Sequence, residues 1–371
     1  MDSTEKLTRM LNLQKPANRR EIPFFPMIIT WSATVAGMTQ AEIMESGDKW
    51  LEAMDICHDL IGKPDVTMMA TPADTVFYMG LPAKTPGAEL GDNELYQFIE
   101  KNAFTREREA EYAYMKEIGF DRWHFEYLMR IQSPPATPEQ LGQRFQTAGM
   151  NCGRNIGHFL SRGIEPVYHL AADPIFDSLS LIRSMQEFIF DLIDDPGPII
   201  DVINMGTPPA VEADIERVKM FHGSRIGIYA MRSSAAFLSP DMFEEYAWPS
   251  LKLRIETYWK AGVTSVLHAD SNWLPMLHYF LELPRCSVHF EFDGCTDMYK
   301  AYDIIGGWHS MRGDVPSTML AFGKPDDVSE YCENLITGIG MRGGFMLGSG
   351  CEIPLNAKLE CVQAMADSLR K

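Results

Sequence analysis

The chain has 371 residues, of which 46% are hydrophobic and 23% charged, and this composition excludes intrinsic disorder and fibrous repeats. The 51 acidic and 33 basic residues give a formal net charge of −18, which argues against nucleic acid or an anionic membrane as a partner. The length fits two average domains or one large α/β barrel.

The seven cysteines are odd in number and widely scattered, and no two form a C-x-x-C pair. This usage predicts reduced thiols and a cytoplasmic protein. The first 25 residues contain no apolar segment of the signal-peptide kind, and no stretch is apolar over the length that a bilayer requires. We therefore expect neither secretion nor membrane insertion.

Short apolar runs alternate with longer amphipathic segments in the first half of the chain. Apolar strands separated by helices indicate a parallel sheet covered by helices. After a short helical leader over 1–21, the predicted elements are a strand at 22–30, a helix at 40–61, a strand at 66–70, a helix at 105–119, a strand at 121–128, a helix at 137–161, a strand at 164–171 and a helix at 173–194.

The second half repeats this alternation more clearly. Ser239 is placed to cap a helix whose first residue is Pro240. The predicted strand–helix pairs are 225–231 with 239–262, 263–270 with 272–283, 287–293 with 296–305, 308–314 with 326–338, and 343–350 with 356–370.

These units number eight or so and show no break in composition. They predict an α/β fold in which residues 1–371 form a single (β/α)8 TIM barrel with a short N-terminal helical leader. An open doubly wound sheet is the competing architecture. It is disfavoured because no glycine-rich dinucleotide turn follows the first strand.

Chemistry in such a barrel belongs at the carboxyl ends of the strands. Four successive predicted strands end in polar residues there, too many for a packed core. They are His268 and Asp270, Glu291 and Asp293, Arg312 and Asp314, and Cys351 with Glu352.

Each of these residues also has a structural explanation. A lone histidine is more often a hydrogen-bonded core residue, Asp270 could cap the next helix, Cys351 could be an inert buried thiol, and Arg312 could form a simple salt bridge. Together they favour a site, and a metal within it remains one of two alternatives.

The same region resembles a known superfamily, the uroporphyrinogen decarboxylases, and within it the corrinoid-dependent methyltransferases that serve as methyltransferase I of anaerobic O-demethylases. The resemblance covers nearly the whole chain and implies a TIM barrel. The segments that carry it are HADSNW, LELP, VHFEFDGCTDMYKAYDIIGG, MRGDVPSTMLAFGKPDDVSEYCENLI and GGFMLGSGCEIPLNAKLECVQAM.

Two departures from the superfamily bear on function. The decarboxylases carry an arginine-rich motif after the first strand, where this chain reads MIITWSATVAG. A substrate with eight carboxylates would meet an apolar and acidic pocket, so decarboxylation is disfavoured. Coenzyme M methyltransferases bind zinc through His-x-Cys and a distant Cys, whereas this chain has His268-Ala-Asp270 and Cys351.

The resemblance implies an enzyme that moves a methyl group from a small methoxylated, aromatic compound to the Co(I) corrinoid of a partner protein. Its catalytic residues would be His268, Asp270, Glu291, Asp293 and Arg312. Zinc is the implied metal, and its expected ligands are His268, Asp270, Glu291 and Cys351; the alternative is an acid cluster without metal. For the substrate ring, the expected pocket residues are Trp31, Phe77 and Tyr78.

Alternative functions remain open from the sequence. They are a uroporphyrinogen decarboxylase-type lyase, a methylcorrinoid:thiol methyltransferase, and a non-catalytic corrinoid-binding protein. A homo-oligomer is compatible with all of them.

Overall fold

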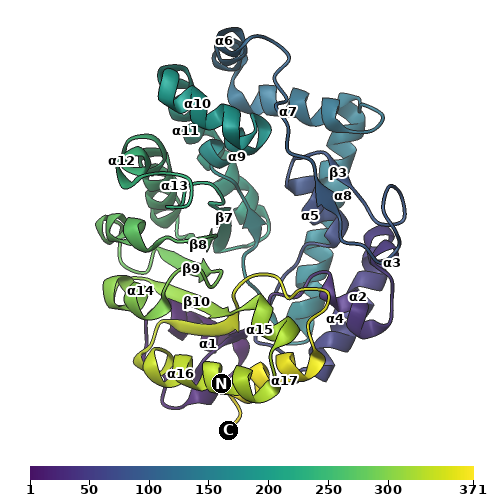
Figure 1. The fold of residues 1–371 in the computed structure, drawn as a ribbon, viewed down its shortest axis with the longest axis vertical. Helices are drawn as coiled ribbons and strands as arrows, with labels where there is room; N and C mark the ends of the chain where they lie inside the picture. The colour runs from purple at the N-terminus through teal and green to yellow at the C-terminus, as the bar shows by residue number, and fades with distance from the viewer.

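The computed structural model describes residues 1–371. Its central feature is a curled parallel sheet of seven strands, on which helices pack from outside (Figure 1). In order across the sheet, the strands are β1 (Phe24–Phe25), β11 (Phe345–Ser349), β10 (Ser310–Val315), β9 (Val288–Phe292), β8 (Thr264–Ala269), β7 (Arg225–Tyr229) and β6 (Leu170–Ala171).

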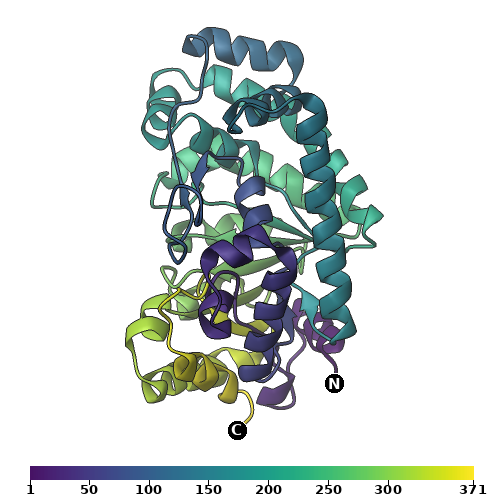
Figure 2. The same cartoon turned by 90° about the vertical axis from the view of Figure 1, so that its right-hand side faces the viewer.

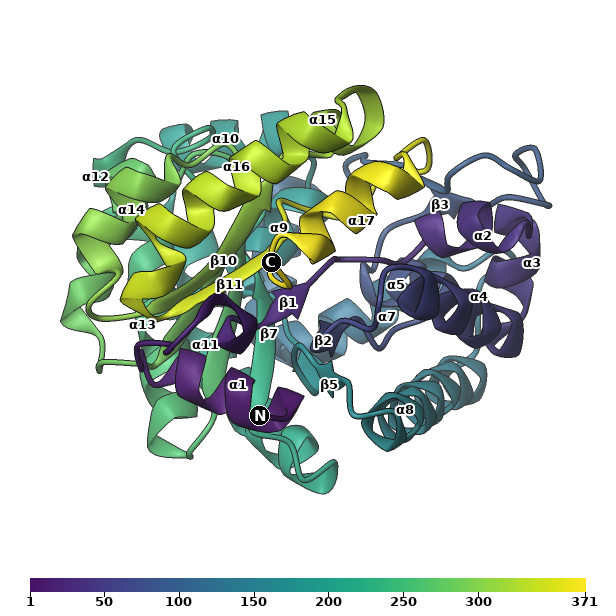
Figure 3. The same ribbon diagram turned by 90° about the horizontal axis from the view of Figure 1, so that it is seen from below.

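Two further strands, β2 (Val66–Thr67) and β5 (Glu165–Pro166), form a separate parallel pair. They lie beside β1 in the view from below (Figure 3). The amide of Asp65 donates to the carbonyl of Phe24 over 3.0 Å, and β5 leads within a few residues into β6. The segments thus follow the expected order of a barrel, but the seven-stranded sheet covers only part of the circle.

The expectation of a complete (β/α)8 barrel is therefore only partly confirmed. Strands β1, β2, β5 and β6 are each two residues long. Pro26 follows β1 directly and Pro166 lies within β5, and neither has the N–H that a ladder requires. Proline thus removes a ladder donor at β1 and at β5.

The helices are longer and more numerous than the strands (Figure 2). An antiparallel pair, β3 (Ala83–Lys84) with β4 (Gln97–Phe98), lies apart from the main sheet. The helices are α1 (Ser3–Leu11), η1 (Arg19–Glu21), α2 (Trp31–Ala36), α3 (Gln40–Glu45), α4 (Gly47–Leu60), α5 (Pro72–Tyr78), α6 (Arg108–Ile118), α7 (Phe120–Ile131), α8 (Pro138–Ser161), α9 (Ile175–Ile182), α10 (Met185–Asp194), α11 (Gly197–Met220), α12 (Pro240–Met242), η2 (Phe243–Ala247), α13 (Trp248–Lys260), η3 (Leu274–Glu282), α14 (Met298–Ile305), α15 (Ser317–Phe322), α16 (Pro325–Gly338), η4 (Gly340–Arg342) and α17 (Leu359–Asp367).

Most predicted elements of the second half are confirmed. The side chain of Ser239 accepts a hydrogen bond from the amide of Met242, and Pro240 is the first residue of α12, as its capping pattern predicts. In the first half, the predicted helices at 105–119 and 137–161 are confirmed as α6 and α8.

The predicted strand at 121–128 is wrong, because these residues belong to helix α7. Aromatic residues favour strands in isolation. Here they recur at helical spacing, and Trp123 and Tyr127 stack with ring centres 5.8 Å apart on the buried face. Helix α11 was not predicted at all; it contains Pro208 and Pro209, which disfavour a helix interior.

One core cluster of 75 buried residues extends from Ile22 to Leu369 and lies between the sheet and its helices. All seven cysteines are free, as their spacing predicts. None of the helices has both the length and the apolar character needed to cross a membrane.

Three histidines of the core are buried, namely His58, His289 and His309. Their burial should make the free energy of unfolding sensitive to acid. Burial lowers the pKa of His58 to about 3 and those of His289 and His309 to about 4. Between pH 6.5 and 4 the unfolded chain binds protons at these histidines that the native chain does not, so their contribution to stability falls as the pH falls through this range.

We expect each of these histidines to contribute a slope of up to about 1.4 kcal/mol per pH unit to the free energy of unfolding. Urea unfolding at pH 7, 6 and 5 measures the dependence of the free energy of unfolding on pH. His309→Asn should reduce its slope. Equal slopes for the wild type and His309→Asn would contradict the prediction.

Candidate active site

Four polar residues lie side by side across the centre of the sheet. Tyr229 on β7 is the register partner of His268 on β8, His268 that of Glu291 on β9, and Glu291 that of Arg312 on β10. Register partners in a parallel sheet project from the same face. The order of the strands therefore sets the order of these side chains.

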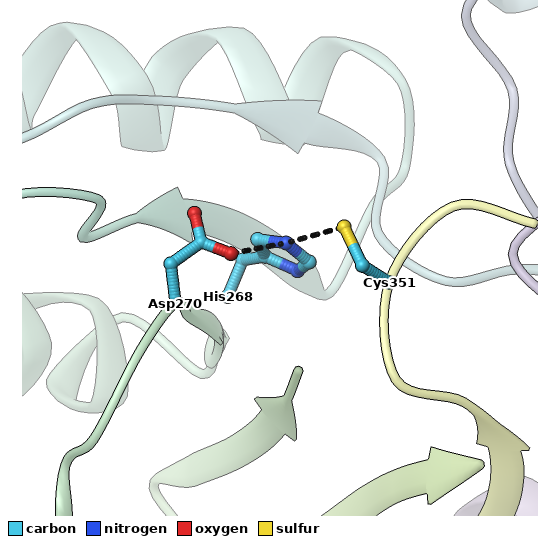
Figure 4. Close-up of side chains that lie close together, drawn as sticks. All are labelled: His268, Asp270 and Cys351. Carbon is cyan, nitrogen blue, oxygen red and sulfur yellow. Dashed lines mark hydrogen bonds and ion pairs between the residues drawn. The ribbon is translucent and has the colours of Figure 1, made fainter. Parts of the chain in front are cut away.

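His268 meets Asp270 and Cys351 at the carboxyl end of the sheet (Figure 4). Its Nε2 lies 3.3 Å from Oδ1 of Asp270 and 3.7 Å from Sγ of Cys351. The His268 side chain is only 6% exposed, whereas that of Asp270 is 31% exposed. The cluster is therefore open to solvent on the Asp270 side and closed behind the imidazole.

The spacing of these three groups fits a metal ion. One ligand atom from each residue lies within 4.8 Å of the other two. A tetrahedral zinc ion with its usual bond lengths needs about 3.4 Å between nitrogen and oxygen ligands and about 3.6 Å between nitrogen and sulfur. The observed 3.3 and 3.7 Å match these separations. Three protein ligands leave a fourth position for a substrate or water.

Glu291, expected as a fourth ligand, is not part of this cluster. Its Oε2 lies 3.1 Å from Nδ1 of His268, the ring nitrogen on the other side of the imidazole from the cluster. Its Oε1 lies 3.4 Å from Nε of Arg312. Glu291 is thus placed to fix the orientation and tautomer of His268, as carboxylates behind metal-binding histidines do.

Arg312 connects Glu291 to the loop that carries Cys351. Its guanidinium donates to the carbonyl of Ser349 over 2.5 Å and to that of Gly350 over 3.2 Å. A side chain on Gly350 would begin 2.5 Å from the Asp293 carbonyl, so glycine is needed for this close approach. The glycines of GSGC thus let Cys351 reach His268.

Asp293 holds the turn after Asp270. Its Oδ2 accepts a hydrogen bond of 2.7 Å from the amide of Ser271, whose φ of +68° lies in the left-handed region. Asp293, expected among the catalytic residues, is therefore placed to orient the backbone next to Asp270, and its carboxylate makes no hydrogen bond to the cluster.

Neighbouring charges counteract the effect of burial on the pKa values of His268 and Glu291. Burial lowers the pKa of His268, but Asp270, Cys351 and Glu291 together raise it well above its ordinary value. Burial raises the pKa of Glu291, yet Arg312 and His268 bring it down to about 2. In the metal-free protein His268 is thus a cation between anions, and a metal ion would take the place of its proton.

The three residues expected to line the substrate pocket are placed differently from that expectation. Trp31 is completely buried, and its indole N–H donates to the carbonyl of Ala357 over 3.0 Å, so it is a core residue. Phe77 packs edge-on against Phe145 of α8 with ring centres 4.8 Å apart. Tyr78 is 40% exposed and lies at the end of the same helix, α5.

Two tyrosines of the site were missed from the sequence. Tyr229 packs against His268 with ring centres 5.3 Å apart, and its hydroxyl forms a short hydrogen bond with that of Tyr168. Tyr229 is the last residue of its strand. The rule that functional side chains lie at the carboxyl ends of the strands therefore applies to Tyr229 as well.

Comparison with known proteins agrees with this architecture. Residues 218–371 match the family Uroporphyrinogen decarboxylase (URO-D). This part of the chain, which carries His268, Glu291, Arg312 and Cys351, is therefore a URO-D family domain, and the resemblance drawn from the sequence is confirmed. No curated protein sequence matches the chain.

Among solved structures, the chain is similar to a methyltransferase from Methanosarcina mazei. The TM-score is 0.72 at 16% sequence identity, and the match covers 100% of this chain and 98% of that chain. At this identity the likeness establishes the shared fold alone. Dispersin B matches over 94% of this chain with a TM-score of only 0.32 and 12% identity, which supports no conclusion.

We expect the purified protein to bind about one Zn²⁺ per chain, because three suitable ligands converge on one point. His268→Ala and Cys351→Ala each remove one of them and should abolish binding, measured by titration with Zn²⁺ and by elemental analysis. Cys286→Ser, at the opposite end of β9, is the matched control and should bind like the wild type. A wild-type protein without affinity for Zn²⁺ would refute the metal site.

Replacing Glu291 by Gln should weaken Zn²⁺ binding about 10- to 100-fold, because the carboxylate behind His268 is lost while its size is kept. The measurement is a competitive chelator titration, with circular dichroism to verify the fold. Glu333→Gln removes a surface carboxylate that pairs with Arg19 and should leave the affinity unchanged. Equal affinities for Glu291→Gln and the wild type would exclude the orienting role.

Proposed function

We propose that this protein is a methyltransferase that takes the methyl group of a small methoxylated, aromatic compound and delivers it to the Co(I) corrinoid of a separate protein. The observation that carries the proposal is the open cluster of His268, Asp270 and Cys351 in a URO-D family domain. The methyltransferase fold of the Methanosarcina mazei protein supports it.

The chemistry requires activation of a poor leaving group. When the electron pair of Co(I) forms a bond to the methyl carbon, the C–O bond breaks and its electron pair stays on the oxygen. Zinc held by the cluster would supply a Lewis acid for that oxygen. The open coordination position would lie beside His268, Asp270 and Cys351. Glu291 fixes the imidazole, and the loops beside it are fixed by Arg312 and Asp293.

The charges of the site disfavour the decarboxylase alternative. Arg312 is the only arginine among these side chains, and Glu291 and two carbonyls already bind it. Arg232, on the segment after β7, is paired with Glu100 at 2.6 Å. A porphyrinogen with several carboxylates would meet Asp270 and no unpaired arginine here, so a neutral ether is favoured.

The test is an assay with a reduced corrinoid protein and a panel of methoxyarenes, in which methyl-Co(III) formation is followed by absorbance. His268→Ala and Cys351→Ala should each lower the rate roughly 10²- to 10⁴-fold, the usual scale for one acid or electrophile, with Cys286→Ser at the wild-type rate. Unchanged rates in both variants would exclude the assigned site.

Other outcomes identify the alternatives. Carbon dioxide release from a porphyrinogen, with no methyl transfer, would identify a lyase. Transfer from methylcorrinoid to a thiol, with no ether cleaved, would identify a thiol methyltransferase. Neither outcome is expected, because Asp270 replaces one of the thiolates that thiol activation uses.

A further inference from the structure

The hydroxyl pair of Tyr168 and Tyr229 lies beside the metal-ligand cluster and has no part in it. Tyr168 belongs to the segment between β5 and β6, and Tyr229 is the last residue of β7. Their hydroxyls form a short hydrogen bond with each other, and neither hydroxyl has another protein partner. They are thus a separate feature of the same strand ends.

The pair has one more hydroxyl proton than its mutual hydrogen bond uses. Two phenol groups carry two hydroxyl protons, and their mutual bond uses one. The second proton has no protein acceptor. Largely buried hydroxyl groups normally find an acceptor, and an unused donor beside a site indicates a ligand.

The exposure of the two side chains indicates which one carries that proton. Tyr168 is 4% exposed, whereas Tyr229 is half-buried. When Tyr168 donates outward to Tyr229, the proton of Tyr229 is free to point to the accessible side. Such a chain also strengthens the outer donor, because each bond polarises the next.

The backbone is built to place this pair. A side chain on Gly227 would begin 2.7 Å from the ring of Tyr168, so only glycine on β7 admits that ring. Tyr229 is in register with His268, and their ring centres are 5.3 Å apart. A small molecule at the open position beside His268 would therefore lie next to the Tyr229 side chain.

The pair is a hydrogen-bond donor and not a base. A phenol has an ordinary pKa near 10, so both hydroxyl groups are protonated and neutral near pH 7. A neutral donor held in a fixed position stabilises negative charge that develops on an oxygen.

We propose that Tyr229, held by Tyr168, donates a hydrogen bond to the oxygen that leaves as phenolate. The inference rests on the proposed function and specifies its substrate class as aryl methyl ethers. No proton is transferred in the step: the C–O electron pair stays on the oxygen, and the Tyr229 O–H binds the resulting anion.

The first experiment needs no corrinoid and tests the oxyanion site directly. Equilibrium binding of 4-nitrophenolate is measured by its absorbance with the wild type, Tyr229→Phe and Tyr168→Phe. Because Tyr229→Phe loses a hydrogen bond to a charged group, we expect it to bind 4-nitrophenolate about 10- to 100-fold more weakly than the wild type. Tyr168→Phe should lose less affinity. Tyr299→Phe, a surface control that is 46% exposed, should bind like the wild type.

The second experiment compares demethylation of 4-nitroanisole and methoxybenzene. The 4-nitrophenolate ion needs little help to leave, so Tyr229→Phe should slow methoxybenzene at least about tenfold more than 4-nitroanisole. A merely structural role would slow both substrates equally.

The outcomes separate the two proposals. Absent binding of 4-nitrophenolate, equal binding by Tyr229→Phe and the wild type, or equal slowing of both ethers would each overturn the role of Tyr229. Binding that depends on Tyr229 in a protein that cleaves no ether would uphold the phenolate site and overturn the proposed methyl transfer.

Discussion

The buried ion pair between Glu291 and Arg312 is the interaction on which the site depends. Both side chains are almost completely buried, at 2% and 0% exposure. Removing two charges from water costs several kcal/mol per ion, which their attraction offsets only when further hydrogen bonds satisfy them. His268 supplies such a bond to Glu291, and two carbonyls of the Cys351 loop supply it to Arg312. Oε1 of Glu291 and Nε of Arg312 have no hydrogen-bond partner and meet only as an ion pair.

These bonds explain why His268 and Cys351, separated by 83 residues in sequence, lie 3.7 Å apart. Register aligns His268, Glu291 and Arg312 on neighbouring strands, and Arg312 then binds the loop that begins where β11 ends. The loop is therefore held from the side opposite to the histidine. Loss of either charged partner would leave the other unpaired, which typically costs about 3–5 kcal/mol and would release the loop.

The sequence predicted the location of the site better than the role of each residue. Strand ends with polar residues identified His268, Asp270 and Cys351, because the strands of the second half are clear apolar runs. The role of Glu291 could not be predicted, since it depends on which ring nitrogen of His268 it faces. Trp31 is a plausible pocket residue as an aromatic side chain after the first strand, whereas in the structure its indole turns into the core.

In the fold, too, some elements could be predicted from the sequence and others could not. Helices α8 and α16 have clear caps and hydrophobic spacing, and they were predicted almost to the residue. The two-residue strands of the first half could not be predicted at their true length, because proline positions and tertiary pairing set it. Aromatic residues in α7 gave the wrong structure because their strand propensity was considered without their spacing.

The proposed ligand set favours an oxygen leaving group. A histidine, a carboxylate and a thiolate carry the same formal charge as a histidine and two thiolates. Carboxylate donates less electron density than thiolate, so a zinc ion held here is a harder Lewis acid and binds oxygen in preference to activating sulfur. The phenol pair flanks His268 on the β7 side, while Glu291 supports it on the β9 side. A neutral ether between them would meet an electrophile and a hydrogen-bond donor at the same oxygen, which is the combination that cleavage of an unactivated methyl ether requires.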